Sequence, residues 1–314
     1  MKKVLVTCPP MLGMIGEFEE YATNLNIELI PAKVTQILTE KELIELLPSF
    51  DGWIIGDDPA SRAVFEAGKK GKLKAAVKWG IGIDNVDFNA CKEFNIPIIN
   101  TPYMFGSEVA DIALAYVIGL ARYLFYIHTE NKFNKLWLKP AGISLAGKNI
   151  AVVGLGDIGN QLVKRLLACE MNVTVYDPFV PTSEIELFNR EEWPNNIEHM
   201  DFVVFTCSLN EKNKHMLNKE VLDLCKNGVY IINVARGPLI DEKALKIALK
   251  SGKVNAVALD VFEEEPLEND SILRDMPYNI LGSHNGSNTK DAVRRASFSA
   301  IDKMHNFLNN VDEK

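Results

Sequence analysis

The chain has 314 residues, of which 47% are hydrophobic and 24% charged, and its formal net charge is -8. These values are ordinary for a globular protein, and the length allows two domains of about 100–200 residues each. The negative charge and the lack of a long basic run argue against binding to nucleic acid or to an anionic membrane. A small anionic substrate is not excluded, because it needs only one or two local cations.

The five cysteines are odd in number, widely spaced and contain no CxxC pair. This pattern favours reduced thiols over a disulfide framework or a zinc site, and no metal site is predicted. The start of the chain, Lys2-Lys3 before a short apolar run, faintly resembles a lipoprotein signal, but the run is too short for one. Residues 109–120 are apolar but too short to span a bilayer, so a buried helix is predicted. We therefore expect a cytoplasmic protein without a membrane partner.

Short apolar runs alternate with helical patterns over residues 1 to about 100. One helix is expected to start at Thr39, because Glu42 stands three residues later in the spacing of a capping box. This first half ends at Pro102, which disfavours a strand or helix running through it. Strands alternating with helices indicate a parallel sheet with helices on both faces. The expected strands are residues 4–6, 27–30, 52–55, 75–78 and 97–99.

One long helix is predicted over residues 107–130, and it is apolar on more than one side. Such a helix must be covered widely, either between domains or by a partner subunit. The following segment, residues 131–144, carries Phe133 and Trp137. These aromatic residues suggest packing on another chain, and a small satellite core is the alternative.

Residues 149–178 have the order of a dinucleotide site: strand, glycine turn, helix, strand and acid. The turn reads GLGDIG at residues 154–159. Gly154 allows the sharp turn, Gly156 lets backbone approach a pyrophosphate, and Gly159 lets the helix pack close to the strand. The N-terminus of the helix offers free N–H groups to the phosphates. A glycine-rich turn in another kind of α/β protein is the alternative explanation.

Asp177 ends the second strand of this unit at about the 20-residue offset where an acid binds the ribose hydroxyls. A 2′-phosphate would be repelled there, and Pro178 and Phe179 supply no cation. The sequence therefore predicts NAD rather than NADP.

The α/β alternation continues after this unit. Helices are expected to start near Asn218 and Asp241, both good N-caps, and a final helix is expected from Thr289 to about Leu308. The predicted fold is α/β, with two doubly wound parallel-sheet domains and the ligand at the carboxyl ends of strands. Further strands are expected at residues 202–205, 229–232, 256–259 and 279–281.

Three polar residues, Arg236, Glu265 and His284, stand at or just after predicted strand ends in the second half. Each has an ordinary explanation, because Arg and Glu are common surface charges and a lone His is more often structural. The residues alone therefore indicate an NAD-binding α/β protein with a candidate Arg/Glu/His set.

Five motifs in order carry a resemblance to a known family. They are GIGIDNVD (80–87), NTP (100–102), the glycine turn, NVARGPLID (233–241) and ALDVFEEEP (258–266). They resemble the signature motifs of the D-2-hydroxyacid dehydrogenases over nearly the whole chain, nearest to the phosphoglycerate dehydrogenase-like enzymes. The resemblance implies an NAD-binding Rossmann domain inserted into a flavodoxin-like substrate domain. The implied boundaries are residues 102–284 for the NAD domain, and 1–101 with 285–314 for the substrate domain.

The resemblance also implies roles. Arg236 would hold the substrate carboxylate and polarise the C2 carbonyl, for which a forked, permanent cation is suited. His284 would be the acid/base, with an imidazole pKa suited to both directions, and Glu265 would fix its tautomer. Asp260 would hold the nicotinamide carboxamide. The implied cofactor-binding residues are Gly154, Gly156, Asp157, Ile158, Gly159, Asp177, Ser208, Val234, Ala235, Arg236, Asp260, His284 and Gly286.

The implied substrate is a small 2-hydroxy or 2-keto acid, such as a 3-phosphoglycerate-like acid, glyoxylate or hydroxypyruvate. A homodimer through residues near 110–145 is implied as well. The runner-up function is a non-enzymatic NAD(H)-sensing regulator or corepressor on the same fold. Substrate-binding residues are implied at Lys78, Trp79, Gly80, Ile81 and Gly82, with backbone N–H groups on the carboxylate, and at Arg236 and His284.

Some positions depart from the family pattern. The loop around the histidine reads SHNGS at residues 283–287, which is more polar than the usual PHIGG, and Ser208 stands where a proline is typical. Residues 56–58 read GDD where phosphoglycerate enzymes usually place a phosphate-binding arginine. Two acids there argue against a phosphorylated substrate, although Lys78 could supply one cation.

Overall fold

The computed structural model describes residues 1–180 and 188–312, and the chain divides into two compact units. Unit 1 comprises Met1–Met104 and Asn288–Lys314, and unit 2 comprises Phe105–Ser287. Both boundaries lie three residues later in the chain than the predicted ones.

Unit 1 is built on a five-stranded sheet in which every pairing is parallel, with the order β2-β1-β3-β4-β5. This is the flavodoxin-like strand order, and its connections reverse direction between β1 and β3. All five strands predicted from the sequence are present. They are β1 (Lys2–Val6), β2 (Ile27–Pro31), β3 (Gly52–Ile55), β4 (Ala75–Lys78) and β5 (Ile98–Asn100).

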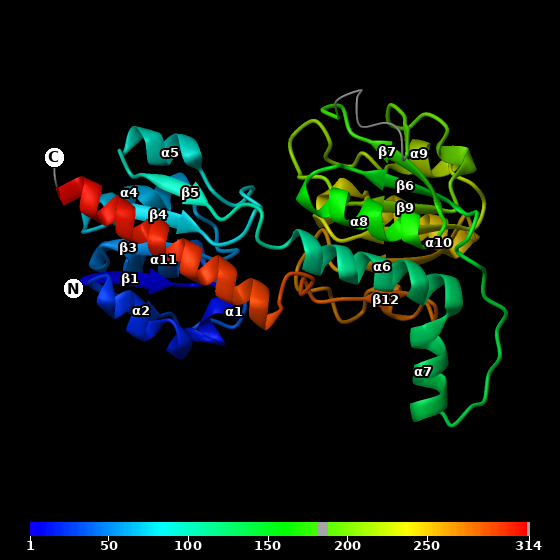
Figure 1. The fold of residues 1–314 in the computed structure, drawn as a ribbon, viewed down its shortest axis with the longest axis horizontal. Coiled ribbons are helices and arrows are strands. Elements are labelled where there is room, and N and C mark those ends of the chain that lie inside the picture. Colours follow the sequence, from blue (N-terminus) through cyan, green and yellow to red (C-terminus); the bar gives the residue numbers. More distant parts are fainter. Residues whose placement is uncertain (181–187, 313–314) are drawn as a thin grey trace. The chain divides into compact units, whose positions relative to one another are not determined.

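Helices cover both faces of this sheet (Figure 1). One face carries α3 (Glu40–Leu46), α4 (Arg62–Lys70) and α5 (Phe88–Glu93), whose apolar residues share a core with Leu5 and Trp53. The C-terminal helix α11 (Lys290–Asp312) packs on β3 and β4, and it contacts α1 (Pro9–Leu12). The helix α2 (Glu19–Asn24) packs on β2.

The predicted capping box at the start of α3 is confirmed. The Thr39 hydroxyl accepts from the Glu42 backbone N–H at 3.3 Å, and the Glu42 carboxylate accepts from the Thr39 N–H at 2.8 Å. Because two helix-terminal donors are satisfied in this way, the helix begins where the sequence indicates.

Unit 2 contains a seven-stranded sheet, again parallel throughout, with the order β12-β11-β10-β9-β6-β7-β8. This is the strand order of the Rossmann fold with one further strand, β12, at the edge. The connections reverse direction between β6 and β9. The strand β8 was not predicted, because two residues are too few to show a period. The strands are β6 (Asn149–Val153), β7 (Asn172–Tyr176), β8 (Asn189–Arg190), β9 (Phe202–Phe205), β10 (Val229–Asn233), β11 (Val254–Leu259) and β12 (Ile280–Leu281).

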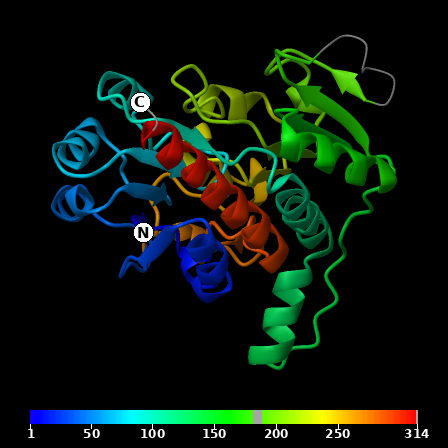
Figure 2. The same ribbon diagram turned by 60° about the vertical axis from the view of Figure 1, so that its left-hand side comes forward.

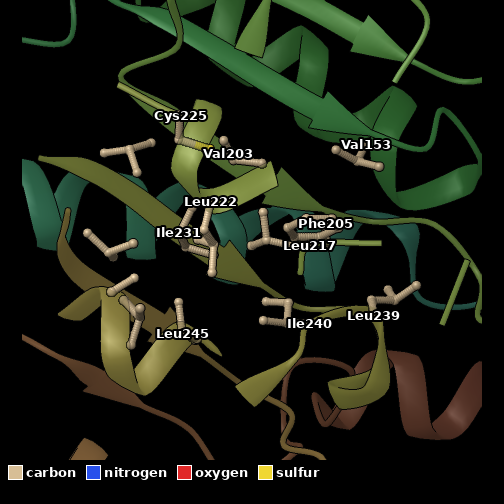
Figure 3. Close-up of a cluster of buried hydrophobic side chains, with 14 of the residues drawn as sticks. Val153, Val203, Phe205, Leu217, Leu222, Cys225, Ile231, Leu239, Ile240 and Leu245 are labelled. Atoms are coloured by element: carbon tan, nitrogen blue, oxygen red, sulfur yellow. The ribbon is translucent and has the colours of Figure 1, made fainter. Parts of the chain in front are cut away.

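One face of this sheet is covered by α6 (Gly106–Arg122) and α8 (Asp157–Ala168), which also pack on each other. The other face packs on α9 (Lys219–Leu224) and α10 (Glu242–Ser251). Figure 3 shows the core on this second face, where Val203, Phe205 and Ile231 meet Leu222 and Leu245. The sheet is therefore buried on both sides, as its continuous apolar strands require.

The prediction of one helix over residues 107–130 is wrong. The helix α6 ends at Arg122, Tyr123 is left-handed with φ 53°, and α7 (Leu124–Phe133) continues at an angle of 70°. The Ala121 carbonyl accepts from the N–H of Ile143 at 2.9 Å, from a segment that returns past the helix end. The helix is broken by this contact between distant segments, which the local sequence does not encode.

The predicted buried helix over residues 109–120 lies within α6, and most of its apolar side chains are buried. No single helix of the described ranges is long and apolar enough to cross a bilayer, and only the bent pair of α6 and α7 could do so together. Within the same ranges, no group of three His, Cys, Asp or Glu side chains is arranged to hold a metal ion. All five cysteines are free thiols: Cys8, Cys91, Cys169, Cys207 and Cys225.

Candidate active site

The three candidate catalytic residues follow three neighbouring strands of unit 2. Arg236 follows β10, Glu265 follows β11, and His284 follows β12. Parallel pairing aligns the ends of these strands, with Asn233 opposite Leu259 and Leu259 opposite Leu281. Adjacent strands are about 4.8 Å apart, so the three residues leave the same edge of the sheet within a short span.

His284 and Glu265 form a direct pair. The His284 Nδ1 lies 2.7 Å from the Glu265 Oε2, and each side chain is 26% exposed. The second carboxylate oxygen of Glu265 accepts from the Phe262 backbone N–H at 3.0 Å, which fixes the orientation of the carboxylate. A carboxylate acceptor holds the ring proton on Nδ1, so Nε2 is the nitrogen suited to exchange a proton with a substrate.

Asp260 organises the loop that carries His284. Its backbone carbonyl accepts from the His284 N–H at 2.6 Å, and its side chain accepts from the N–H groups of Asn285 at 3.3 Å and Gly286 at 2.8 Å. These bonds hold His284 at φ 55°, a left-handed conformation that is costly for a residue with a side chain. The structure therefore gives Asp260 a loop-positioning role beside the carboxamide role expected from the family resemblance.

Tyr116 of α6 supplies a further donor to Asp260, its hydroxyl lying 3.3 Å from Oδ1. Burial raises the pKa of Tyr116, and the negative charge of Asp260 raises it further, so the hydroxyl remains a donor at neutral pH. Tyr116 was not predicted from the sequence as a site residue. The one feature that could have indicated it is its hydroxyl group on an otherwise apolar face of the helix.

The turn that presents Arg236 is held by Asn233, whose side chain is almost fully buried. Its amide donates to the Arg236 carbonyl at 2.8 Å, and its carbonyl oxygen accepts from the Ala235 N–H at 3.0 Å. The Arg236 guanidinium donates to the Ala235 carbonyl at 2.8 Å. Asn233 is a second positioning residue that the sequence analysis missed, and Val234 and Ala235 are buried at the same strand end.

The glycine turn between β6 and α8 has the geometry that a dinucleotide phosphate needs. Gly154 has φ 100°, and a Cβ on Gly159 would lie 2.1 Å from the Gly154 carbonyl oxygen. By contrast, a Cβ on Gly156 would meet nothing within 4 Å, so the turn is open above this residue. Thr206, also missed from sequence, donates to the Gly154 carbonyl at 2.7 Å and holds the turn. Asp157 and Ile158 form the first turn of α8, whose N–H groups point toward the open side.

Asp177 lies beside this turn at the end of β7. Its carboxylate accepts from the N–H groups of Leu155 at 2.7 Å and Phe179 at 2.8 Å. Each oxygen keeps a further lone pair that can accept from a ribose hydroxyl. Ser208 is exposed after β9, the neighbour of β6, and so lies at the same edge. These residues fit an adenosine dinucleotide.

The predicted substrate-binding loop of unit 1 follows β4, and the structure narrows its donors. The Trp79 N–H donates to the Ile55 carbonyl at 2.9 Å, and the Gly80 N–H donates to the Thr101 hydroxyl oxygen at 2.8 Å. The Trp79 ring is buried and its Nε1 donates to Ser297 at 3.1 Å. Two of the N–H groups that were predicted to hold a carboxylate, those of Trp79 and Gly80, are therefore already bonded within unit 1.

Residues 114–286 match the model of the D-isomer specific 2-hydroxyacid dehydrogenase NAD binding domain. The chain belongs to the D-2-hydroxyacid dehydrogenase family. The matched range falls within unit 2, so the cofactor of this unit is a nicotinamide dinucleotide.

Relatives that align along most of this chain support this placement in the family. The chain is 34% identical to D-3-phosphoglycerate dehydrogenase of Methanocaldococcus jannaschii over 98% of its own length, but it spans only 58% of that protein. It is also 34% identical to hydroxypyruvate reductase of Thermotoga maritima over 91% of this chain and 94% of that one. Among solved structures of D-2-hydroxyacid dehydrogenases, the apo D-lactate dehydrogenase of Escherichia coli is similar, with a TM-score of 0.82 and 25% identity. That alignment covers 99% of this chain and 98% of the other.

Proposed function

We propose that this protein is an NAD-dependent oxidoreductase that interconverts a D-2-hydroxy acid and its 2-keto acid. The observation that carries the proposal is the His284–Glu265 pair, 2.7 Å apart at the carboxyl edge of the NAD-binding unit. A histidine whose Nδ1 proton is held by a carboxylate is suited to general acid/base catalysis through Nε2. Arg236 leaves the same edge of this sheet, after β10, and supplies the permanent cation that a carboxylate substrate needs.

In the proposed reduction, the keto acid gains one hydride at C2 and one proton at the carbonyl oxygen. The reduced nicotinamide cofactor, when held by the residues of unit 2, would be the source of the hydride, with its electron pair, that C2 of the keto acid gains. His284 gives the Nε2 proton to the carbonyl oxygen, whose C=O double bond becomes the C–OH of the product. Glu265 stabilises the imidazolium before this transfer, and His284 is protonated again from water. Oxidation of the hydroxy acid runs through the same positions in reverse.

We propose that the substrate is bound by an arginine side chain and by backbone N–H groups. Arg236 binds the carboxylate and polarises the C2 carbonyl. In unit 1, the N–H groups of Ile81 and Gly82 are the proposed carboxylate donors. We accordingly assign substrate binding to unit 1 and NAD binding to unit 2. The candidates to test are the acids named for the relatives, which include hydroxypyruvate, glyoxylate and 3-phosphoglycerate.

Asp177 supports NAD over NADP. Its carboxylate stands beside the glycine turn, where it would accept from both ribose hydroxyls and repel a 2′-phosphate. We expect kcat/KM with NADH to exceed that with NADPH by about 100-fold, a difference of roughly 3 kcal/mol between charge repulsion and hydrogen bonding. Similar kcat/KM values for the two cofactors would contradict this assignment.

An exposed apolar surface supports a homodimer through residues near 110–145. Figure 1 shows α7 projecting away from the sheet of its unit. Phe133 and Trp137 are 66% and 80% exposed, and Leu124, Phe125 and Leu136 are also exposed. A surface of this kind is typical of a subunit interface. Sedimentation should give twice the chain mass of 35.1 kDa.

The five free thiols support a cytoplasmic location.

The test is NADH oxidation with glyoxylate, hydroxypyruvate, pyruvate and 3-phosphohydroxypyruvate. Wild-type protein should reduce at least one of them. His284→Ala should lower kcat by about 10²–10⁴, the range of general acid/base catalysis. Arg236→Ala should abolish most of kcat/KM.

Thermal unfolding of the two variants serves as the control for folding, and NADH binding by the wild type is followed by fluorescence titration. Wild-type turnover no greater than that of His284→Ala with every acid would contradict the proposal. Retained NADH binding with no turnover would instead favour the runner-up, a non-enzymatic NAD(H)-sensing regulator or corepressor.

A further inference from the structure

Three segments of unit 2 are bonded to one another beside the proposed catalytic residues. They follow the adjacent parallel strands β9, β10 and β11, and they comprise residues 208–217, 236–242 and 260–266. Their colours run from yellow-green toward orange in the second view of the ribbon (Figure 2). The second segment carries Arg236 and the third carries Glu265, so the bonds between these segments help to set the geometry of the proposed active site.

Two acids, Glu242 and Glu263, bind each other's backbone across the second and third segments. The Glu263 carboxylate accepts from the Glu242 N–H at 3.0 Å, and the Glu242 carboxylate accepts from the Glu263 N–H at 3.3 Å. Glu242 is the first residue of α10, where a backbone N–H has no partner within the helix. The reciprocal bonds therefore join the segment that follows Arg236 to the segment that leads to Glu265.

The same two segments are in close backbone contact at Gly237. A Cβ on this residue would lie 1.9 Å from the carbonyl carbon and oxygen of Phe262, and 2.4 Å from the Glu263 nitrogen. Only glycine fits there, so the backbone beside Arg236 packs directly on the third segment. Phe262 in turn donates its N–H to the Glu265 carboxylate at 3.0 Å. A displacement of this backbone would therefore move the Glu265 carboxylate.

His215, in the first segment, binds the other oxygen of Glu263. Its Nε2 lies 2.5 Å from the Glu263 Oε1, and its backbone N–H donates to the Pro238 carbonyl at 2.8 Å. His215 has φ 53°, a left-handed conformation that is costly for a residue with a side chain. These two bonds maintain that conformation and orient the ring toward Glu263.

Lys246 completes this group of charged side chains. Its ammonium lies 2.6 Å from the Glu242 carboxylate, one helical turn along α10. Glu263 therefore has a histidine on one oxygen and a backbone N–H on the other, and Glu242 has a lysine and a backbone N–H. Because each carboxylate has a partner on both oxygens, the network fixes the position of both side chains.

We propose that Glu263, oriented by His215, is a positioning residue that fixes the Arg236 turn relative to Glu265. The inference rests on the proposed function, and it adds two residues of unit 2 that act through other residues. Arg236 polarises the C2 carbonyl while Glu265 orients the acid/base His284, so both must serve the same carbonyl group. A displacement of about 1 Å between such groups can lower a rate by about 100-fold.

The first test is steady-state reduction of the best keto acid of the panel by Glu263→Ala. We expect kcat to fall by about 10- to 100-fold, because the two segments lose their shared bonds. KM for the keto acid should rise several-fold as Arg236 is displaced. KM for NADH should change by less than about threefold, because the proposed pyrophosphate turn follows β6, two strands away from β10. Partial unfolding alone would change neither KM.

Two further substitutions control for charge and for folding. Glu264→Gln is the matched control, because this exposed acid lies between Glu263 and Glu265 on the same segment, and its kinetic constants should equal those of the wild type. Glu263→Gln keeps an oxygen for the Glu242 N–H and should lose less than about tenfold in kcat. Because it retains this bond, Glu263→Gln also serves if Glu263→Ala does not fold.

A double-mutant cycle tests whether His215 and Glu263 act as a pair. His215→Ala alone should lower kcat/KM for the keto acid by about three- to tenfold, as expected for one hydrogen bond. Combined with Glu263→Ala, it should cause no further loss. Fully additive losses would show that His215 does not act through Glu263.

Hydrogen exchange followed by mass spectrometry gives a measurement that does not depend on turnover. Glu263→Ala should speed amide exchange in residues 236–242 and 260–266 by about tenfold or more, and Glu264→Gln should not. Unchanged exchange or unchanged kinetic constants in a folded Glu263→Ala variant would overturn the inference. If the wild type reduces no acid of the panel, the proposed function fails, while faster exchange in Glu263→Ala would still show that Glu263 holds the two segments together.

Discussion

His284 illustrates how many of the contacts around a proposed catalytic residue come from outside its own motif. The sequence indicates the residue, its position after a strand and, by resemblance, its partner Glu265. It does not show that Asp260 fixes the left-handed backbone of His284 through the loop N–H groups. Nor does it show that Tyr116 reaches Asp260 from a helix 144 residues away in the chain. These partners are set by tertiary packing, which a local motif does not specify.

Removing the Tyr116 hydroxyl should loosen the His284 loop. We expect Tyr116→Phe to cost about 1–3 kcal/mol of unfolding free energy, because the buried Asp260 carboxylate loses a donor. Activity should fall several-fold in kcat with a smaller change in KM. The pKa of Tyr116 is raised in the folded state, so its stabilising contribution is complete below the ordinary tyrosine pKa and is lost only as the pH rises through the raised value. The stability difference should therefore be constant from pH 7 to about 9 in urea denaturation.

Tyr21→Phe is the matched control, because Tyr21 donates to Asp302 at 2.6 Å on the surface of unit 1. An exposed hydrogen bond of this kind should be worth less than about 1 kcal/mol, and kcat should not change. Equal effects of the two variants on kcat would show that Tyr116 does not position the His284 loop.

At the scale of elements, the sequence predicts best where the signal is local. Every strand predicted from an apolar run is present, and the capping box at Thr39 forms as expected. The failures have a different origin. The break at Tyr123 depends on the Ala121–Ile143 contact, and the edge strand β8 is too short to show a period.

The β6–α8 turn allows the cofactor's place to be tested with two similar substitutions. Gly156→Ala adds a methyl group to open space at an ordinary φ of -71°, so stability should change little while NADH binding weakens by tenfold or more, about 1.4 kcal/mol. Gly159→Ala forces a methyl group onto the Gly154 carbonyl, so unit 2 should lose several kcal/mol of stability. Thermal unfolding and fluorescence titration with NADH measure the two effects. Full NADH affinity in Gly156→Ala would place the pyrophosphate elsewhere.

At the scale of the whole molecule, the chain forms two units, and the proposed ligand-binding residues lie at the carboxyl edges of two parallel sheets. In unit 2, the sequence indicates which residues stand at these strand ends, because its motifs combine glycine geometry with acids and bases. In unit 1, the sequence indicates that Lys78, Trp79 and Asp58 stand near strand ends. It does not show that their side chains are buried and hydrogen-bonded within the unit. Sequence shows which residues follow a strand, but burial decides which of them remain available.

The central claim is that hydride transfer to C2 of a 2-keto acid is coupled to proton transfer from His284. The most direct measurement is reduction of the best keto acid of the panel by NADH deuterated at C4, in separate experiments with each C4 stereoisomer. We predict that one isomer gives a D-2-hydroxy acid with a single deuterium at C2, and that His284→Ala suppresses its formation. If both isomers gave a product without deuterium at C2, or if His284→Ala formed the product at the wild-type rate, the account would be contradicted.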